Sequence, residues 1–114
     1  MRAAVATPLQ NGGENLLYFE HARLSAEYCE RRGFPVRDSL ESWNRANAGL
    51  HSQSIQAVRG HAERRGLSKT EQDAILVEAI ENMRKQAQEH ISRKGVACKN
   101  FVGVLLMYSS LFKR

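Results

Sequence analysis

Hydrophobic residues recur at intervals of three and four along most of the chain, which is the spacing of one face of an α-helix. A first helix is predicted over residues 14–32, and its apolar face carries Leu17, His21, Leu24 and Tyr28. Gly33 and Pro35 follow it, an order typical of a helix C-terminus. The preceding residues contain Pro8 and the pair Gly12–Gly13, which favour loops. We therefore expect a flexible lead over residues 1–13 and a single helical domain over residues 14–114, since this length suits one domain.

The second predicted helix begins at Asp38, which has the spacing of a capping box with Glu41. It continues to about Arg65, and its apolar stripe consists of Leu40, Trp43, Asn47, Leu50, Ser54, Val58 and Ala62. Gly49 and Gly60 interrupt it, and each costs about 1 kcal/mol relative to alanine in a helix interior. A break near Gly49 would make five helices rather than four.

The third predicted helix has the clearest start in the chain, because Ser68 and Glu71 form a capping-box pattern. It ends near Lys94–Gly95, and its apolar face carries Leu76, Ile80, Met83, Ala87 and Ile91, widened by Ile75, Val77 and Ala79. No stretch shows the sustained alternation of a strand. The chain is therefore predicted to be an all-α bundle of four helices, or five.

The most apolar stretch is KNFVGVLLMY, Lys99 to Tyr108, close to the C-terminus. Asn100 can cap a last helix over residues 101–112, one face of which carries Phe101, Leu105, Tyr108 and Phe112. Apolar residues cover most of its other faces as well, and such a helix has to be buried nearly all round. We expect it either at the centre of the core, wrapped by the other helices, or in a dimer interface.

The charge distribution predicts a nucleic-acid-binding surface. The chain has 17 Lys and Arg against 12 Asp and Glu, and the excess lies in residues 34–66 and 95–114. If the helix ends converge, one patch would bind phosphate through Arg59, Arg64, Arg65, Lys69, Arg93, Lys94 and Lys99. The alternative is that these side chains only complement the dipoles of the helices that they end.

Two segments resemble parts of known nucleic-acid-binding proteins. HAERRGLSKTEQDAIL resembles the core of the helix-turn-helix motif, in which the second helix enters the major groove. Gln72 stands where that family has a buried aliphatic residue, and Glu71 and Asp73 would face phosphates, so a plain αα-hairpin is the alternative. HISRKGVACKNFVGVLLMYSSLFKR is similar to the closing helices of replication proteins from plasmids and integrating elements, with Phe101 in place of their proline.

Other chemistry receives little support from the sequence. The four histidines and two cysteines show no metal-ligand spacing, and no nucleophile motif or phosphate loop occurs, so we predict no metal, no cofactor and no enzymatic activity. Cys29 and Cys98 lie far apart behind an N-terminus without a secretory apolar core. Two free thiols in the reducing cytoplasm are therefore expected. No apolar run reaches the roughly 18 residues of a membrane span.

These observations lead to two functional hypotheses. The first is a small non-enzymatic accessory protein that binds nucleic acid through a basic, sequence-tolerant surface, as a subunit of a nucleoprotein complex of a bacterial mobile element, phage or defence system. The second is a helical protein–protein interaction module or regulator that homodimerises through its apolar C-terminal helix. Phosphate binding weakens steeply with salt, whereas an apolar interface hardly responds, so salt dependence distinguishes them.

Overall fold

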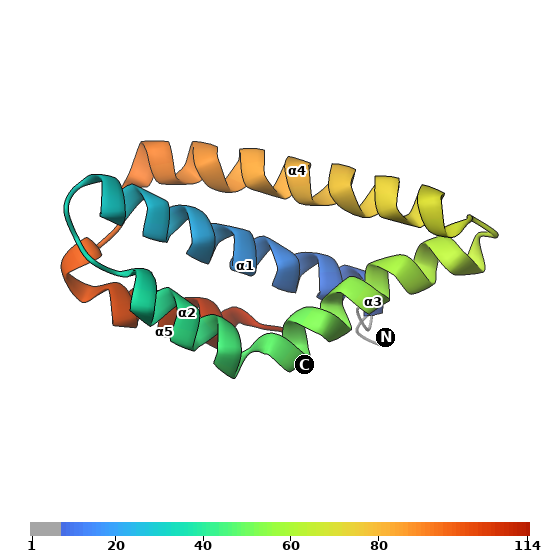
Figure 1. The fold of residues 1–114 in the computed structure, drawn as a ribbon, viewed down its shortest axis with the longest axis horizontal. Helices are drawn as coiled ribbons and strands as arrows, with labels where there is room; N and C mark the ends of the chain where they lie inside the picture. Colours follow the sequence, from blue (N-terminus) through green and yellow to red (C-terminus); the bar gives the residue numbers. More distant parts are fainter. Residues whose placement is uncertain (1–7) are drawn as a thin grey trace, which may run out of the picture.

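The computed structural model describes residues 8–114, which form an all-α bundle without strands, as predicted. It contains five α-helices and one short 3₁₀-helix (Figure 1). In chain order these are α1 (Pro8–Arg31), α2 (Arg37–Ala46), α3 (Ala48–Arg64), α4 (Lys69–Lys94), η1 (Cys98–Asn100) and α5 (Phe101–Leu111).

The central helix is α1, and this corrects the expectation that the C-terminal helix is wrapped by the others. In Figure 1, α1 runs between α4 on one side and α2, α3 and α5 on the other, and it contacts all four. Small residues explain why: Ala22, Ser25, Ala26 and Cys29 are all buried in α1. Their short side chains let neighbouring helices approach from several sides.

Helix α1 begins at Pro8, so the prediction of a flexible lead is wrong for residues 8–13, and residues 1–7 lie outside the described part of the chain. Gly12 shows the reason. It is buried against α3, so closely that a Cβ atom there would lie 2.9 Å from the carbonyl oxygen of Ser54. Tertiary packing on α3 outweighs the low helix propensity of the two glycines.

The second predicted helix is divided, as the glycine pattern allowed. Asn47 separates α2 from α3, and its side-chain Nδ2 donates a hydrogen bond of 2.8 Å to the Trp43 carbonyl oxygen. The predicted capping role of Asp38 is wrong. The backbone N–H groups of Val36, just before α2, and of Arg37, its first residue, instead donate hydrogen bonds of 3.0 Å and 2.9 Å to the carboxylate of Glu30 in the last turn of α1.

The capping predictions for α4 and α5 are confirmed. Ser68 and Glu71 form both hydrogen bonds of the capping box, and Asn100 Oδ1 accepts from Gly103 N at 3.3 Å. The predicted apolar face of α4 is buried or half-buried. Its expected widening is wrong at Ile75 and Val77, which are exposed because α4 is an outer helix that packs inward through a single stripe.

Helix α5 contributes one face to the main core. The four side chains predicted for that face are all buried and join α1 and α2 in one cluster: Phe101, Leu105, Tyr108 and Phe112. Within the single chain it is not buried all round, because it packs mainly against α1 and α2 at the edge of the bundle and leaves its outer face open. The segment after α5 is held on α1 by the buried side chain of Asn15. This side chain donates a hydrogen bond of 2.7 Å to the Lys113 carbonyl oxygen and accepts one of 2.8 Å from Lys113 N.

Candidate nucleic-acid interface

The predicted basic residues lie at two opposite ends of the bundle. Arg64, Arg65 and Lys69 surround the turn between α3 and α4, whereas Arg93 and Lys94 lie at the far end of α4 (Figure 1). A 26-residue helix is about 39 Å long. The expected single patch is therefore wrong, because the length of α4 keeps the two groups apart. Lys99, in η1, belongs to the second group.

Arg59, predicted to bind phosphate, already has an acidic partner within the protein. Its guanidinium is partly buried and forms an ion pair with Asp73, so that its charge is already balanced within the α3–α4 hairpin. The exposed predicted residues at this end are therefore Arg64, Arg65 and Lys69, and the capping-box carboxylate of Glu71 lies in the same first turn as Lys69.

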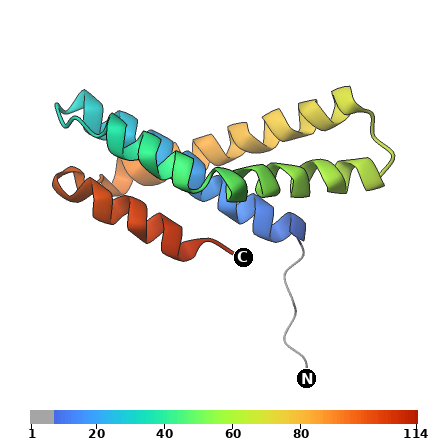
Figure 2. The same ribbon diagram turned by 60° about the horizontal axis from the view of Figure 1, so that its bottom comes forward.

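The segment that resembles a helix-turn-helix motif forms an antiparallel hairpin. Helices α3 and α4 lie next to each other and both pack on α1 (Figures 1 and 2). Gly66 has a positive φ of 81° and makes the turn, while Ala62 is buried where the two helices meet. Gln72 donates 3.1 Å to the Leu67 carbonyl oxygen and packs in the turn rather than in a core.

The opposite end carries a denser basic surface, which we call the basic pole. There α1 and α4 end, α2 begins, and η1 follows (Figure 1). Six exposed basic residues lie in these segments: Arg31, Arg32, Arg37, Arg93, Lys94 and Lys99. No ion pair within residues 8–114 involves any of them.

Sequence reasoning missed the three basic residues at the α1–α2 connection, Arg31, Arg32 and Arg37. Residues 1–33 as a whole have no net charge, because their acidic side chains balance the basic ones. This average conceals the basic residues at the C-terminal end of α1. Residues 28–38 and 92–100 together hold six basic and two acidic side chains, a net charge of +4 against +5 for the whole chain. The sequence does show a basic pair at the end of each of two predicted helices, Arg31–Arg32 and Arg93–Lys94. The two pairs lie at the same end of the bundle only because α1 and α4 run in the same direction.

A disulfide bond between Cys29 and Cys98 joins the two halves of the basic pole. It links the last turn of α1 to the start of η1, with a Cα–Cα distance of 5.5 Å, and it leaves no free cysteine in the chain. The prediction of two free thiols is therefore wrong. The cysteines are 69 residues apart in sequence, and only the return of the chain along α4 brings them together.

Two further contacts order the α1–α2 connection. The Arg32 guanidinium lies 3.4 Å from the centroid of the Tyr28 ring and donates 3.2 Å to the Tyr28 carbonyl oxygen. Gly33 has a positive φ of 87°, which ends α1 and turns the chain towards α2. These contacts and the disulfide hold the backbone that carries the exposed basic side chains.

Dipole compensation accounts for only part of the basic pole. Arg31, Arg93 and Lys94 lie in the last turns of helices, where a cation interacts favourably with the negative end of the dipole. Arg37 is different, because it is the first residue of α2, where a positive charge is unfavourable. Lys99 lies in η1, just before α5.

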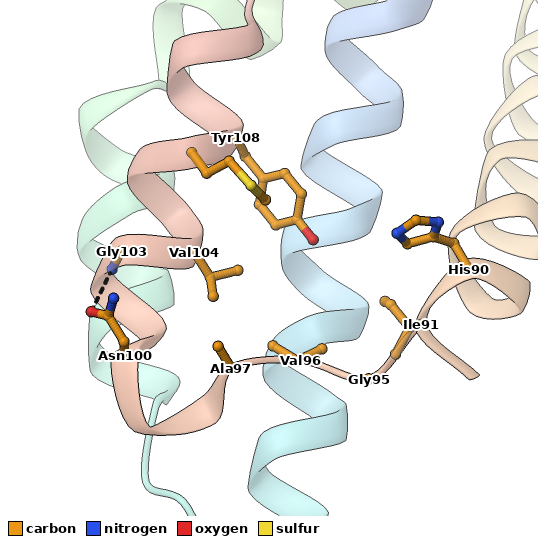
Figure 3. A pocket seen from close by; sticks show the side chains of 10 residues that line it. His90, Ile91, Gly95, Val96, Ala97, Asn100, Gly103, Val104 and Tyr108 are labelled. Carbon is orange, nitrogen blue, oxygen red and sulfur yellow. Dashed lines mark hydrogen bonds between the residues drawn. The ribbon is translucent and has the colours of Figure 1, made fainter. Parts of the chain in front are cut away.

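A groove between the end of α4 and α5 lies beside the basic pole (Figure 3). It has a volume of about 330 Å³, and its walls include Ile91, Val104 and Tyr108. The ring of His21, on α1, lies 5.5 Å from the ring of His90, which lines the groove, centroid to centroid. Burial, and next the charge of His90, lower the pKa of His21 below its usual 6.5.

Tyr108, which lines this groove, has a hydrogen-bond partner inside the bundle, whereas one nitrogen of His21 has none. The Tyr108 hydroxyl and Ser25 Oγ are 3.1 Å apart and hydrogen-bonded inside the bundle. The Nδ1 atom of His21 is buried without a hydrogen-bond partner. Within residues 8–114, no group of three or more His, Cys, Asp or Glu side chains is arranged to hold a metal ion.

Comparisons with known proteins do not identify a family. No protein-family model matches the chain, and searches of curated proteins and of solved structures find no similar protein. Among the helices described, none is both long and apolar enough to cross a membrane.

Proposed function

We propose that the protein is a small non-enzymatic accessory protein that binds nucleic acid in a sequence-tolerant manner through its basic pole. The observation that carries this proposal is the gathering of six exposed basic side chains at one end of the bundle, none of them in an ion pair within residues 8–114, in segments that hold most of the net charge of the chain. Nucleic-acid phosphates supply a matching density of negative charge, and arginine binds them bidentately.

The composition of the pole supports binding without sequence preference. Arginine and lysine contacts to phosphates position a protein on nucleic acid but carry no direct sequence information. Arg37 supports a binding role in particular, since its position at the start of α2 costs helix stability rather than adding to it. The proposed phosphate-binding residues are therefore Arg31, Arg32, Arg37, Arg93, Lys94 and Lys99.

The disulfide bears on where such binding would take place. Disulfides persist in oxidising compartments and are rare in the reducing cytosol. We therefore propose that the protein is located in an oxidising compartment, in place of the cytoplasmic location expected from the sequence. A role in a mobile element, phage or defence system stays a prediction.

Fluorescence anisotropy of labelled single- and double-stranded oligonucleotides tests the proposal. If all six basic residues contact phosphates of duplex DNA, the logarithm of the binding constant falls with the logarithm of salt concentration with a slope of about −5. The key variant is Arg93→Gln/Lys94→Gln, at the end of α4. Its matched control is Arg64→Gln/Arg65→Gln, which removes the same charge from the end of α3, at the opposite end of the bundle.

The two double variants have opposite expected results. Arg93→Gln/Lys94→Gln should weaken duplex binding roughly tenfold or more at about 0.1 M salt and reduce the salt slope by about 2. Arg64→Gln/Arg65→Gln should change it little, because the distance along α4 exceeds the Debye length of about 10 Å several times. Absence of binding at low salt, or equal losses in both variants, would refute the proposal. A loss confined to the control would instead place binding at the α3–α4 turn.

A further inference from the structure

Exposed apolar side chains cover the outer face of α5, which we call the α5 ridge: Val102 and Leu106 border a groove on the α2 side, and Met107 borders the groove on the α4 side. Val102, Leu106, Met107 and Leu111 have exposed fractions of 58%, 62%, 50% and 42%. No charged residue occurs from Phe101 to Leu111. The four side chains leave roughly 400 Å² of apolar surface open to solvent, and an apolar patch of this size, about 300–600 Å², is often a functional site.

A groove borders this ridge on the side of α2. It has a volume of about 350 Å³, and its residues are Asp38, Ser39, Ser42, Trp43, Val102, Leu105 and Leu106. Trp43 and Leu105 are buried, and Trp43 Nε1 donates 2.6 Å to Ser109 Oγ, which holds α2 against α5. The groove is therefore part of the ordered core rather than a gap between mobile segments.

We infer that the α5 ridge and the α2–α5 groove form the interface of a homodimer. Val102 and Leu106 belong to the ridge and also form a wall of the groove, so the protruding and the receiving surfaces are adjacent on one copy. A twofold axis then places the ridge of each copy in the groove of the other, which is the self-complementary arrangement of a symmetric dimer.

The amount and chemistry of the surface favour a second copy as the occupant. A standard interface buries about 800 Å² on each partner, and the ridge supplies about half of this as its apolar centre. The groove adjoins this apolar centre, with Asp38, Ser39 and Ser42 at the start of α2 as a polar rim. The ridge has no charge with which to select a charged partner, whereas a second copy brings an apolar ridge of matching length.

The test measures the mass of the full chain by light scattering and sedimentation equilibrium from low-micromolar to millimolar concentration. We expect twice the single-chain mass of 12.9 kDa. Leu106→Glu, at the centre of the ridge, should shift the protein to a monomer, since it places a carboxylate in an apolar interface. Val77→Glu is the matched control, because Val77 is an exposed aliphatic residue on α4, outside the ridge, with an exposed fraction of 68%.

Circular dichroism shows whether each variant retains its helicity, and both residues are exposed enough for the fold to tolerate the change. A monomeric wild-type chain at all concentrations overturns the inference, as does a Leu106→Glu variant that stays dimeric. Equal dissociation of both variants would place the contact elsewhere and also overturns it. The inference is independent of nucleic-acid binding: Arg93→Gln/Lys94→Gln should remain dimeric, and the dimer should persist at high salt because its contacts are apolar.

Discussion

Breaking the Cys29–Cys98 disulfide should remove a large part of the stability of the fold. The bond joins the last turn of α1 to η1, two segments 69 residues apart in the sequence. The perturbation is made in two ways, by chemical reduction of the wild-type chain and by the double variant Cys29→Ala/Cys98→Ala. Reduction keeps the sulfur atoms in place, whereas the variant also leaves a small space at the fully buried Cys29.

The magnitude follows from the length of the closed loop. A sequence separation of 69 residues corresponds to a loss of unfolded-state entropy worth about 4 kcal/mol at 25 °C in the chain-entropy description. Domains are typically stable by only about 5–15 kcal/mol, so this bond contributes a quarter or more. The double variant should lose about 1 kcal/mol more, through the atoms removed from the core.

Urea unfolding followed by far-ultraviolet circular dichroism measures these changes in the oxidised chain, the reduced chain and the double variant. Adding reductant to the double variant should have no effect, which separates the bond from side effects of the reagent. Two thiols that react with an alkylating reagent in the unfolded, unreduced chain would show that the bond does not form. A loss below about 1 kcal/mol on reduction would contradict the entropy argument.

Two other predictions concern α1. Gly12→Ala and Gly13→Ala share the same gain in helix propensity, but only the Cβ at position 12 meets the Ser54 carbonyl oxygen, so the first variant should be less stable than the second by about 1–3 kcal/mol in urea unfolding. Burial lowers the pKa of His21 in the folded chain, so on acidification the unfolded chain takes up a proton at this histidine first. The free energy of unfolding should therefore decrease as the pH falls below 6.5. Urea unfolding midpoints of the wild type and of His21→Phe at several pH values measure this decrease.

Each of these predictions has a clear contrary outcome. Equal stabilisation by the two alanine variants would mean that α1 and α3 do not pack closely at Gly12. For His21, the wild-type midpoint should fall more steeply with acid than that of His21→Phe. Parallel pH profiles would show that the imidazole is not held neutral between α1 and the His90 side of α4.

The sequence alone was sufficient to predict most of the helices and their ends, because those signals are local. Ser68 with Glu71 caps α4, Asn100 caps α5, and the glycines at positions 33, 66 and 95 end helices with positive φ. The periodic stripes from α2 to α5 were also largely correct, since a residue on the apolar face of a helix has to be buried against some neighbour. The stripe predicted for α1 was not, because only Leu24 of it is buried and this central helix packs through several faces. The identity of that neighbour cannot be read from the stripe.

Tertiary structure decided the features that depend on distant residues meeting. Small side chains made α1 the central helix and extended it back to Pro8, against local propensity. The parallel course of α1 and α4 brought Cys29 to Cys98 and gathered the basic pole, whereas the length of α4 separated the residues expected to form one patch. Helix formation depends on interactions within a few residues, but charge clusters and disulfides depend on topology. The helices can therefore be predicted from the sequence, whereas the basic pole and the disulfide bond follow only from the fold.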